Sequence, residues 1–290
     1  LDTYIWLMVD LFMGILIIGI TISMLLFVAY KIFNFIFEDH VLGVTLWRRR
    51  KEVSKFDRAA IKTILKRKVP YFNALSIGGK EKFLNRVLNH YIGKEFISQE
   101  GQVITREVKT LISAGAAQLT FGLDFSFLRY FPEYHVYPRS FKLSKRHPRM
   151  YGATSPKGLI WFSWAHVEKG YEDYSDGVNL AIHEFAHALY LQHRQGMVWE
   201  ADWLVIYENW MAFAHSKLRN ASAQERKFFR RDIRKIPTEL FPVMVEEFFE
   251  RPNEFVRAFP DIYVGLVRLM NQDPRNAKLD YRPKMRGFFG

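Results

Sequence analysis

The feature that most constrains this chain is an uncharged run of twenty residues near its start, Leu11–Tyr30, between Asp10 and Lys31. As a helix, a run of this length rises about 30 Å, which matches the hydrocarbon core of a bilayer. A buried core helix is the alternative. A cleaved signal peptide is disfavoured, because the residues before the run carry only acidic charges where a signal peptide carries basic ones. We therefore predict a membrane anchor in residues 1–40, with its span at about 11–30.

The basic residues of the chain gather after this run. The formal net charge is +12, and residues 48–68 contain ten Lys or Arg against Glu52 and Asp57, a net +8. Basic residues that follow a span favour the cytoplasmic side and are attracted to anionic lipid head groups. A nucleic-acid patch and a solvated helix face are the alternatives, but the sequence shows no zinc finger, recognition helix or RNA-binding motif. We predict a single-pass membrane protein with its main domain in the cytoplasm and no nucleic-acid partner.

The rest of the chain is typical of an α+β domain in which helices dominate. Helical periodicity predicts helices at Lys55–Lys68, Lys80–Phe96, 106–121 and, with interruptions near 194–198 and 235–237, from about Ser175 onward. Two short aromatic or β-branched segments, Glu133–Tyr137 and Leu159–Trp164, are predicted to be strands. We expect one domain over residues 41–290, with a helical part at 41–130 and the chemistry at 131–290.

The chemistry is indicated by His183-Glu184-Phe185-Ala186-His187, an HExxH motif. On a helix the two histidines lie one turn apart on the same face, so both imidazoles can bind one metal ion. Glu184 can then act as the general base toward an attacking water. Because the chain has no cysteine, thiolate ligands are unavailable, and imidazole with carboxylate predicts Zn²⁺. Two solvated histidines are the alternative, which the apolar neighbour Ile182 disfavours.

A third ligand is needed, and His193 stands where some HExxH peptidases place a third histidine. The turn-forming glycine of that pattern is Tyr190 here. Without it the helix is expected to continue, and His193 would then point away from His187. A solvated histidine near the helix end is the simpler interpretation.

A second helix, predicted after Thr238, offers carboxylates instead. Three of them share one stripe opposite an apolar face, and a fourth lies nearer the apolar edge. The stripe consists of Glu239, Glu246 and Glu250, and the fourth residue is Glu247. Periodicity does not choose between Glu246 and Glu247, and an exposed acidic face is the alternative. Glu200 and Glu208 are weaker candidates.

The residues around these motifs resemble the Mlc titration factor A family of zinc peptidases. The likeness is strongest over Tyr151–Gln192, including Gly158-Leu159-Ile160-Trp161-Phe162-Ser163-Trp164, and over Glu246-Glu247-Phe248-Phe249-Glu250-Arg251-Pro252. It continues through Val69–Phe72, residues 103–123 and Asn271–Pro274, and so covers about Thr45 to Pro274.

The resemblance implies a zincin-like fold of the gluzincin type, in which a glutamate on a second helix completes the zinc site. It implies that His183 and His187 are ligands, that Glu184 is the base, and that the third ligand is Glu246. It also implies aminopeptidase-type activity, and its soluble relatives bind a glucose-responsive transcriptional repressor. The family usually has a Tyr before the third-ligand helix, suited to stabilising an oxyanion, but residues 231–235 contain none. That role is therefore unassigned or falls to another residue such as Tyr207.

Several neighbours of the site have two interpretations. Asn179 is either a partner behind the ligands or the cap of the helix. Glu239 and Glu250 either orient a ligand or bind a substrate amine, or they are surface carboxylates. Trp161 either lines a substrate pocket or belongs to the core, and its segment Leu159–Trp164 is either an edge strand that pairs with a peptide or a core strand.

The sequence thus predicts a membrane-anchored zinc metallopeptidase that acts on a peptide or protein substrate. The alternative is a membrane-tethered regulatory protein, with a structural or vestigial zinc site, that captures a transcriptional regulator.

Overall fold

The computed structural model describes residues 6, 8, 11–29, 53–124, 127–144, 148–195, 201–222, 227–229 and 237–283. The chain divides into two units, Leu1–Glu52 and Val53–Gly290, which are considered separately. In the first, the helix Leu11–Ala29 has a mean hydropathy of 2.7 and is long and apolar enough to cross a membrane. None of its most apolar window is buried, whereas a core helix of a soluble protein would be mostly buried. Residues 48–52 of the predicted basic stretch lie outside the described residues.

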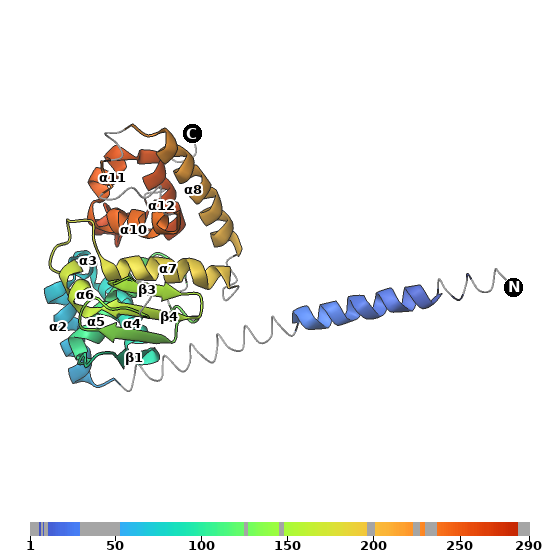
Figure 1. The fold of residues 1–290 in the computed structure, drawn as a ribbon, viewed down its shortest axis with the longest axis horizontal. Helices are drawn as coiled ribbons and strands as arrows, with labels where there is room; N and C mark the ends of the chain where they lie inside the picture. Colours follow the sequence, from blue (N-terminus) through green and yellow to red (C-terminus); the bar gives the residue numbers. More distant parts are fainter. Residues whose placement is uncertain are drawn as a thin grey trace. The chain divides into compact units, whose positions relative to one another are not determined.

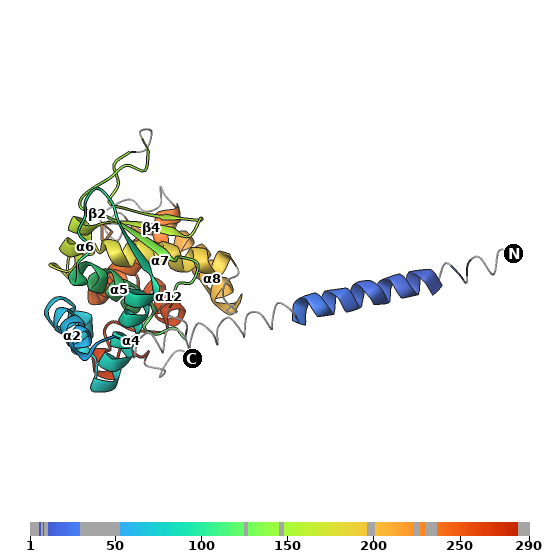
Figure 2. The same ribbon diagram turned by 90° about the horizontal axis from the view of Figure 1, so that it is seen from below.

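The second unit combines helices with a four-stranded sheet (Figures 1 and 2). Its elements are, in order, α2 (Lys55–Lys68), α3 (Pro70–Ala74), α4 (Ile77–Gly93), β1 (Glu95–Ser98), α5 (Arg106–Thr120), β2 (Glu133–Tyr137), β3 (Gly152–Ser155), β4 (Leu159–Ser163), α6 (Trp164–Gly170), α7 (Leu180–Arg194), α8 (Ala201–Asn220), the 3₁₀ turn η2 (Pro237–Glu239), α10 (Leu240–Glu250), α11 (Pro252–Ala258), α12 (Pro260–Met270) and the 3₁₀ turn η3 (Ala277–Leu279). The prediction of a mostly helical domain with a small sheet is confirmed.

Side-chain caps fix where several helices begin. The hydroxyl of Ser76 accepts a hydrogen bond from the Gly79 N–H at the start of α4, and the hydroxyl of Thr105 accepts one from the Val108 N–H at the start of α5. Such caps satisfy N–H groups that have no partner within the helix. The helix predicted at Lys80–Phe96 is therefore shifted, because it begins next to Ser76 and ends at Gly93.

The sheet has the strand order β1-β2-β4-β3, in which β3 alone runs antiparallel to its neighbour. The prediction that Leu159–Trp164 could be an edge strand is wrong, since β4 lies between β2 and β3. The sequence did not predict β1 and β3. The residues of β1 were included in a helix, and Gly152-Ala153-Thr154-Ser155 lacks the apolar alternation of a strand. Pairing with β2 and β4 makes both segments strands.

One face of the sheet is covered by the helix that carries the HExxH motif. Phe185 of α7 is fully buried and contacts the rings of Tyr134 on β2 and Phe162 on β4, with centroids 5.4 Å apart in each pair. On its other side α7 lies along α10, so it is placed between the sheet and the C-terminal helices (Figure 1). The HExxH motif of α7 therefore faces both β3 and α10.

Candidate metal centre

The helix α7 presents its two histidines toward α10. The Asn179 side chain caps α7 by accepting a hydrogen bond from the Ile182 N–H, at 3.2 Å, and Ile182 itself is fully buried. With α7 held in this way, the rings of His183 and His187 lie on the same side of the helix, with centroids 5.1 Å apart. The predicted i, i+4 arrangement of the two imidazoles is therefore present in the structure.

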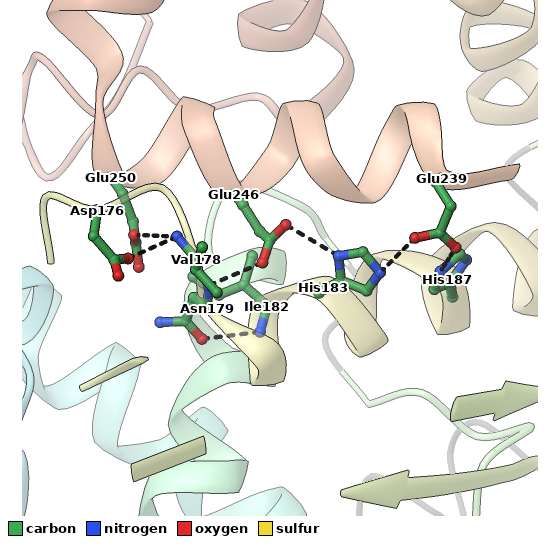
Figure 3. A network of polar contacts seen from close by, with 9 residues as sticks. All are labelled: Asp176, Val178, Asn179, Ile182, His183, His187, Glu239, Glu246 and Glu250. Carbon is green, nitrogen blue, oxygen red and sulfur yellow. Dashed lines mark hydrogen bonds and ion pairs between the residues drawn. The ribbon is translucent and has the colours of Figure 1, made fainter. Parts of the chain in front are cut away.

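A carboxylate from the second helix faces both rings. Glu239 ends the 3₁₀ turn η2 and occupies the N-cap position of α10. Its Oε2 lies 3.3 Å from Nε2 of His183, and its Oε1 lies 3.3 Å from Nε2 of His187 (Figure 3). Hydrogen bonds with the two rings hold the pKa of the Glu239 carboxyl well below its usual range. One atom from each of these three side chains lies within 4.8 Å of the others, and the group could hold a metal ion.

Glu246 contacts the opposite side of the same histidine. Its Oε2 lies 3.0 Å from Nδ1 of His183, and its Oε1 accepts the backbone N–H of Asn179 at 2.9 Å. Figure 3 shows His183 between Glu246 on one side and Glu239 on the other. Although burial opposes protonation, the carboxylates of Glu246 and Glu239 raise the pKa of His183 to about 10. Glu246 thus fixes the orientation of the ring whose Nε2 points to Glu239.

Glu184 is held on the sheet side of α7, next to β3. The Thr154 hydroxyl donates to Glu184 Oε2 at 2.8 Å and lies 3.1 Å from the Glu184 carbonyl oxygen. Gly152 leaves room for the carboxylate, because a Cβ at this position would lie 2.3 Å from Glu184 Oε1. The side chain is only 4% exposed, and this burial raises the pKa of Glu184.

All of these groups border a single cleft of about 1140 Å³. Residues 150–154 and His166 line it, as do Tyr190 and Arg194 from the end of α7. The volume is large enough for a ligand of several residues, because typical small-molecule sites measure about 300–1,000 Å³. The arrangement of two imidazoles, a shared carboxylate and a buried carboxylate beside a cleft suits metal-assisted hydrolysis.

Comparison with known proteins agrees with this chemistry. The sequence model of a family described as glucose-regulated metallo-peptidase M90 matches residues 44–270, most of the chain. The chain belongs to this family. The resemblance to the Mlc titration factor A family is thereby confirmed. The chain is also similar to an uncharacterised protein of Synechocystis sp., with 24% identity over 81% of this chain and 93% of that protein.

Three other candidate residues of this M90 family member, Glu250, Asn179 and Glu247, do not belong to the cluster of His183, His187 and Glu239. The carboxylate of Glu250 is buried and accepts the Val178 N–H at 2.9 Å, and its burial raises its pKa to about 8. Asn179 caps α7, which is one of its two predicted roles, and it also donates its backbone N–H to Glu246. Glu247 does not face the cluster, because it pairs with Arg251.

The structure does not bring two further candidates to the metal cluster. Trp161 contacts His135 of β2, with ring centroids 5.7 Å apart, and is only partly buried, whereas its neighbours Ile160 and Phe162 are fully buried. His193 is buried on Trp203, with ring centroids 4.0 Å apart, and its Nδ1 lies 2.8 Å from the Leu189 carbonyl oxygen.

Two further candidate residues belong to α8, and a third precedes this helix in the sequence. Glu208 and Tyr207 both line the cleft. Tyr207 stacks on Tyr190, and burial holds its pKa well above the usual range of a tyrosine. Glu200 lies outside the described residues.

Sequence reasoning missed Gly152 and Thr154, the two residues that position Glu184. Both belong to β3, and a four-residue strand without apolar alternation gives little signal. A small residue that must face Glu184 can be found only once the strand is placed against α7.

Proposed function

We propose that this protein is a zinc-dependent peptidase in which His183, His187 and Glu239 hold the metal and Glu184 is the general base. The observation that carries the proposal is that both oxygens of Glu239 face the Nε2 atoms of the two histidines at 3.3 Å. This assignment gives Glu239 the role that the resemblance implied for Glu246, and gives Glu246 the role of a positioning residue.

The donor atoms fit zinc. Zinc bonds to imidazole nitrogen and carboxylate oxygen are about 2.0–2.1 Å long, and a tetrahedral arrangement then separates ligand atoms by roughly 3.3–3.4 Å. Each of the two distances to Glu239 is close to this separation, although they join different carboxylate oxygens, and one ligand atom from each of the three side chains lies within 4.8 Å of the others. A set of two histidines and one glutamate leaves a fourth position open, as catalytic zinc sites do. Glu246 supports the set, since zinc-bound histidines usually donate their other ring N–H to a carboxylate or carbonyl.

In the proposed mechanism, a metal ion held by His183, His187 and Glu239 would polarise the substrate carbonyl and would make water easier to deprotonate. Glu184 takes the proton of the attacking water and passes it to the leaving amine. Thr154 holds the Glu184 carboxylate in place through its hydroxyl. The raised pKa of Glu184 suits a group that must first accept a proton and then donate it.

The finer features of the family resemblance belong to the same proposal. They are a zincin-like fold of the gluzincin type and an aminopeptidase-type activity. The ligand set supports the first, because two histidines of one helix and a glutamate at the start of another face a shared point. The volume of the cleft, about 1140 Å³, and its lining from Leu180 to Arg194 of α7 are compatible with short peptides as substrates.

Removal of the metal tests the proposal directly. We expect the full-length protein, purified in detergent without chelator, to contain about one zinc per chain and to hydrolyse peptides. A strong chelator should abolish hydrolysis, and added zinc should restore it. Hydrolysis that survives complete removal of zinc would disprove the proposed role of the metal.

Gly152→Ala is expected to lower hydrolysis by roughly 10- to 100-fold, because misplacing a catalytic group by about 1 Å can cost this much. The new methyl group would lie 2.3 Å from Glu184 Oε1, so the carboxylate must move. Zinc affinity should change little. The control is Gly78→Ala in α4, whose Cβ would meet only the Ser76 hydroxyl at 3.9 Å. Full activity of both variants would show that hydrolysis does not depend on the position of the Glu184 carboxylate beside β3.

We also propose that Leu11–Ala29 spans a membrane once and that the second unit lies in the cytoplasm. The length and hydropathy of the helix support the span, and the basic residues after it support the orientation. The protein should stay in the membrane fraction after alkaline extraction. Replacing Ile17 and Ile18 with Arg should release it, because each charge at the centre of a span costs about 2.5–3.5 kcal/mol. Extraction of the unaltered protein would contradict the anchor.

One sequence observation favours a second candidate function. Residues 231–235 contain no Tyr, the residue type expected there for oxyanion stabilisation. The protein would then be a membrane-tethered regulatory module that captures a transcriptional regulator and keeps its metal site for structure. In that case the wild-type protein would hydrolyse no peptide, and Glu184→Gln would leave the capture of the regulator unchanged.

A further inference from the structure

We propose that Tyr151, stacked on His166, forms the subsite for the substrate side chain that follows the scissile bond, and that it selects a large apolar or aromatic side chain. This inference rests on the proposed peptidase function and assigns the specificity of the same site. It concerns a part of the cleft that plays no role in metal binding or proton transfer.

The position of Tyr151 places it next to the proposed base. It directly precedes Gly152, the first residue of β3, whose Cα faces the Glu184 carboxylate so closely that no side chain fits between them. Tyr151 and His166 line the same cleft as Glu184 and the metal cluster. If the scissile bond of a substrate lies beside Glu184, the Tyr151 side chain is therefore about one residue further along the substrate.

The Tyr151 ring is both accessible and fixed. The residue is 56% exposed, although its ring stacks on His166 with centroids 3.9 Å apart and planes 20° from parallel. The Tyr151 carbonyl accepts the Ser163 N–H at 2.7 Å, and the Ser163 hydroxyl lies 2.8 Å from Nδ1 of His166. Ser163 itself is fully buried. The two rings are thus anchored to one buried residue, and a substrate would meet a surface that is already ordered.

The chemistry of this part of the cleft favours an apolar side chain. An exposed aromatic face gains from contact with another ring or an aliphatic chain. Met150 and Val178 also line the cleft, and Val178 is 44% exposed. Two charged residues that are near His166 and Val178 in the sequence, Lys169 and Asp176, also line the cleft. Their charges have opposite signs, so they do not favour one substrate charge.

The direction of the substrate follows from β3. Among the described strands, β3 pairs with β4 alone, so its other edge is available to an extended peptide over Gly152–Ser155, up to the bridge between Met150 and Phe141. A peptide that pairs antiparallel with β3 runs from the side of Ser155 toward Gly152. With the scissile carbonyl beside Glu184, the next side chain of such a peptide lies at Tyr151. The subsite therefore belongs to the leaving-group side of the bond.

Peptides that differ only in the residue after the scissile bond, Phe or Ala, test this inference. The ratio of kcat/KM for Phe over Ala is measured with full-length protein in detergent. We expect Tyr151→Ala to lower this ratio about tenfold, His166→Ala to lower it about threefold, and Tyr151→Phe to leave it unchanged. The control is Tyr137→Ala, which removes a comparable ring stacked on Phe141 at 4.2 Å but does not line the cleft.

Binding separates this inference from the proposed function. Uncleaved peptides of the same pair are titrated into the zinc-loaded Glu184→Gln protein, with and without Tyr151→Ala. A lost preference for Phe supports the subsite even if no variant hydrolyses peptides, an outcome that would refute the peptidase proposal alone. The subsite is refuted if hydrolysis proceeds but Tyr151→Ala keeps the preference. It is also refuted if Tyr151→Phe lowers kcat equally for both peptides, because the hydroxyl would then serve the chemistry.

Discussion

Glu184→Gln is expected to reduce peptide hydrolysis by roughly 10²- to 10⁴-fold, the range that a positioned general base contributes. The loss follows because a neutral amide cannot accept the proton of the attacking water. Gln keeps the size of the side chain, and its carbonyl oxygen can still accept the hydrogen bond from the Thr154 hydroxyl. The fold and the metal cluster should therefore be preserved. Steady-state kinetics and zinc analysis of the same preparation measure both effects.

The matched control is Glu254→Gln on α11. Glu254 pairs with Arg257 at the surface and does not line the cleft, so this variant should keep full activity. Activity of Glu184→Gln within a few-fold of wild type would exclude Glu184 as the base. A Glu184→Gln protein that has lost its zinc would assign this residue to the metal site instead.

The second large effect distinguishes the two glutamates that face His183. Glu239→Gln is expected to weaken zinc binding by more than about 100-fold, beyond what the loss of an outer partner of a ligand costs. Glu246→Gln is expected to weaken it by about 10- to 100-fold. Competition with a chromophoric chelator measures both affinities on the full-length protein.

The order of these effects follows from the contacts. Glu239 faces Nε2 of both histidines, so replacing it removes a ligand. Glu246 accepts one contact from His183 Nδ1 and one from the Asn179 N–H. A Gln at position 246 keeps one acceptor oxygen and so loses only one of these contacts. If Glu246→Gln abolishes zinc binding while Glu239→Gln retains it, the roles assigned here are reversed.

Much of the fold could be predicted from local signals in the sequence. The capping side chains of Thr105 and Asn179 mark the starts of α5 and α7, and Val69-Pro70 ends α2 where expected. The HExxH motif likewise determines its own geometry, because one helical turn separates the two histidines. These features depend on residues within a few positions of one another.

The partner of the histidines could not be predicted in this way. Glu239 and Glu246 are seven residues apart, about two helical turns, so both lie on the same side of their helix. Which of them faces the Nε2 atoms depends on how far α10 is shifted along α7. The contact of Glu246 with the Asn179 N–H fixes that shift. The start of the helix directly after Thr238 is also predicted wrongly, because Thr238 belongs to a 3₁₀ turn and Glu239 occupies the N-cap position of α10.

The identity of the residues that bind the metal is the central claim. Anomalous diffraction at the zinc absorption edge, from crystals of the zinc-loaded protein, tests it most directly. The predicted result is one strong peak within bonding distance, about 2.0–2.2 Å, of His183 Nε2, His187 Nε2 and a Glu239 oxygen. A peak bonded to Glu246 in place of Glu239, or no peak beside the two histidines, would contradict it.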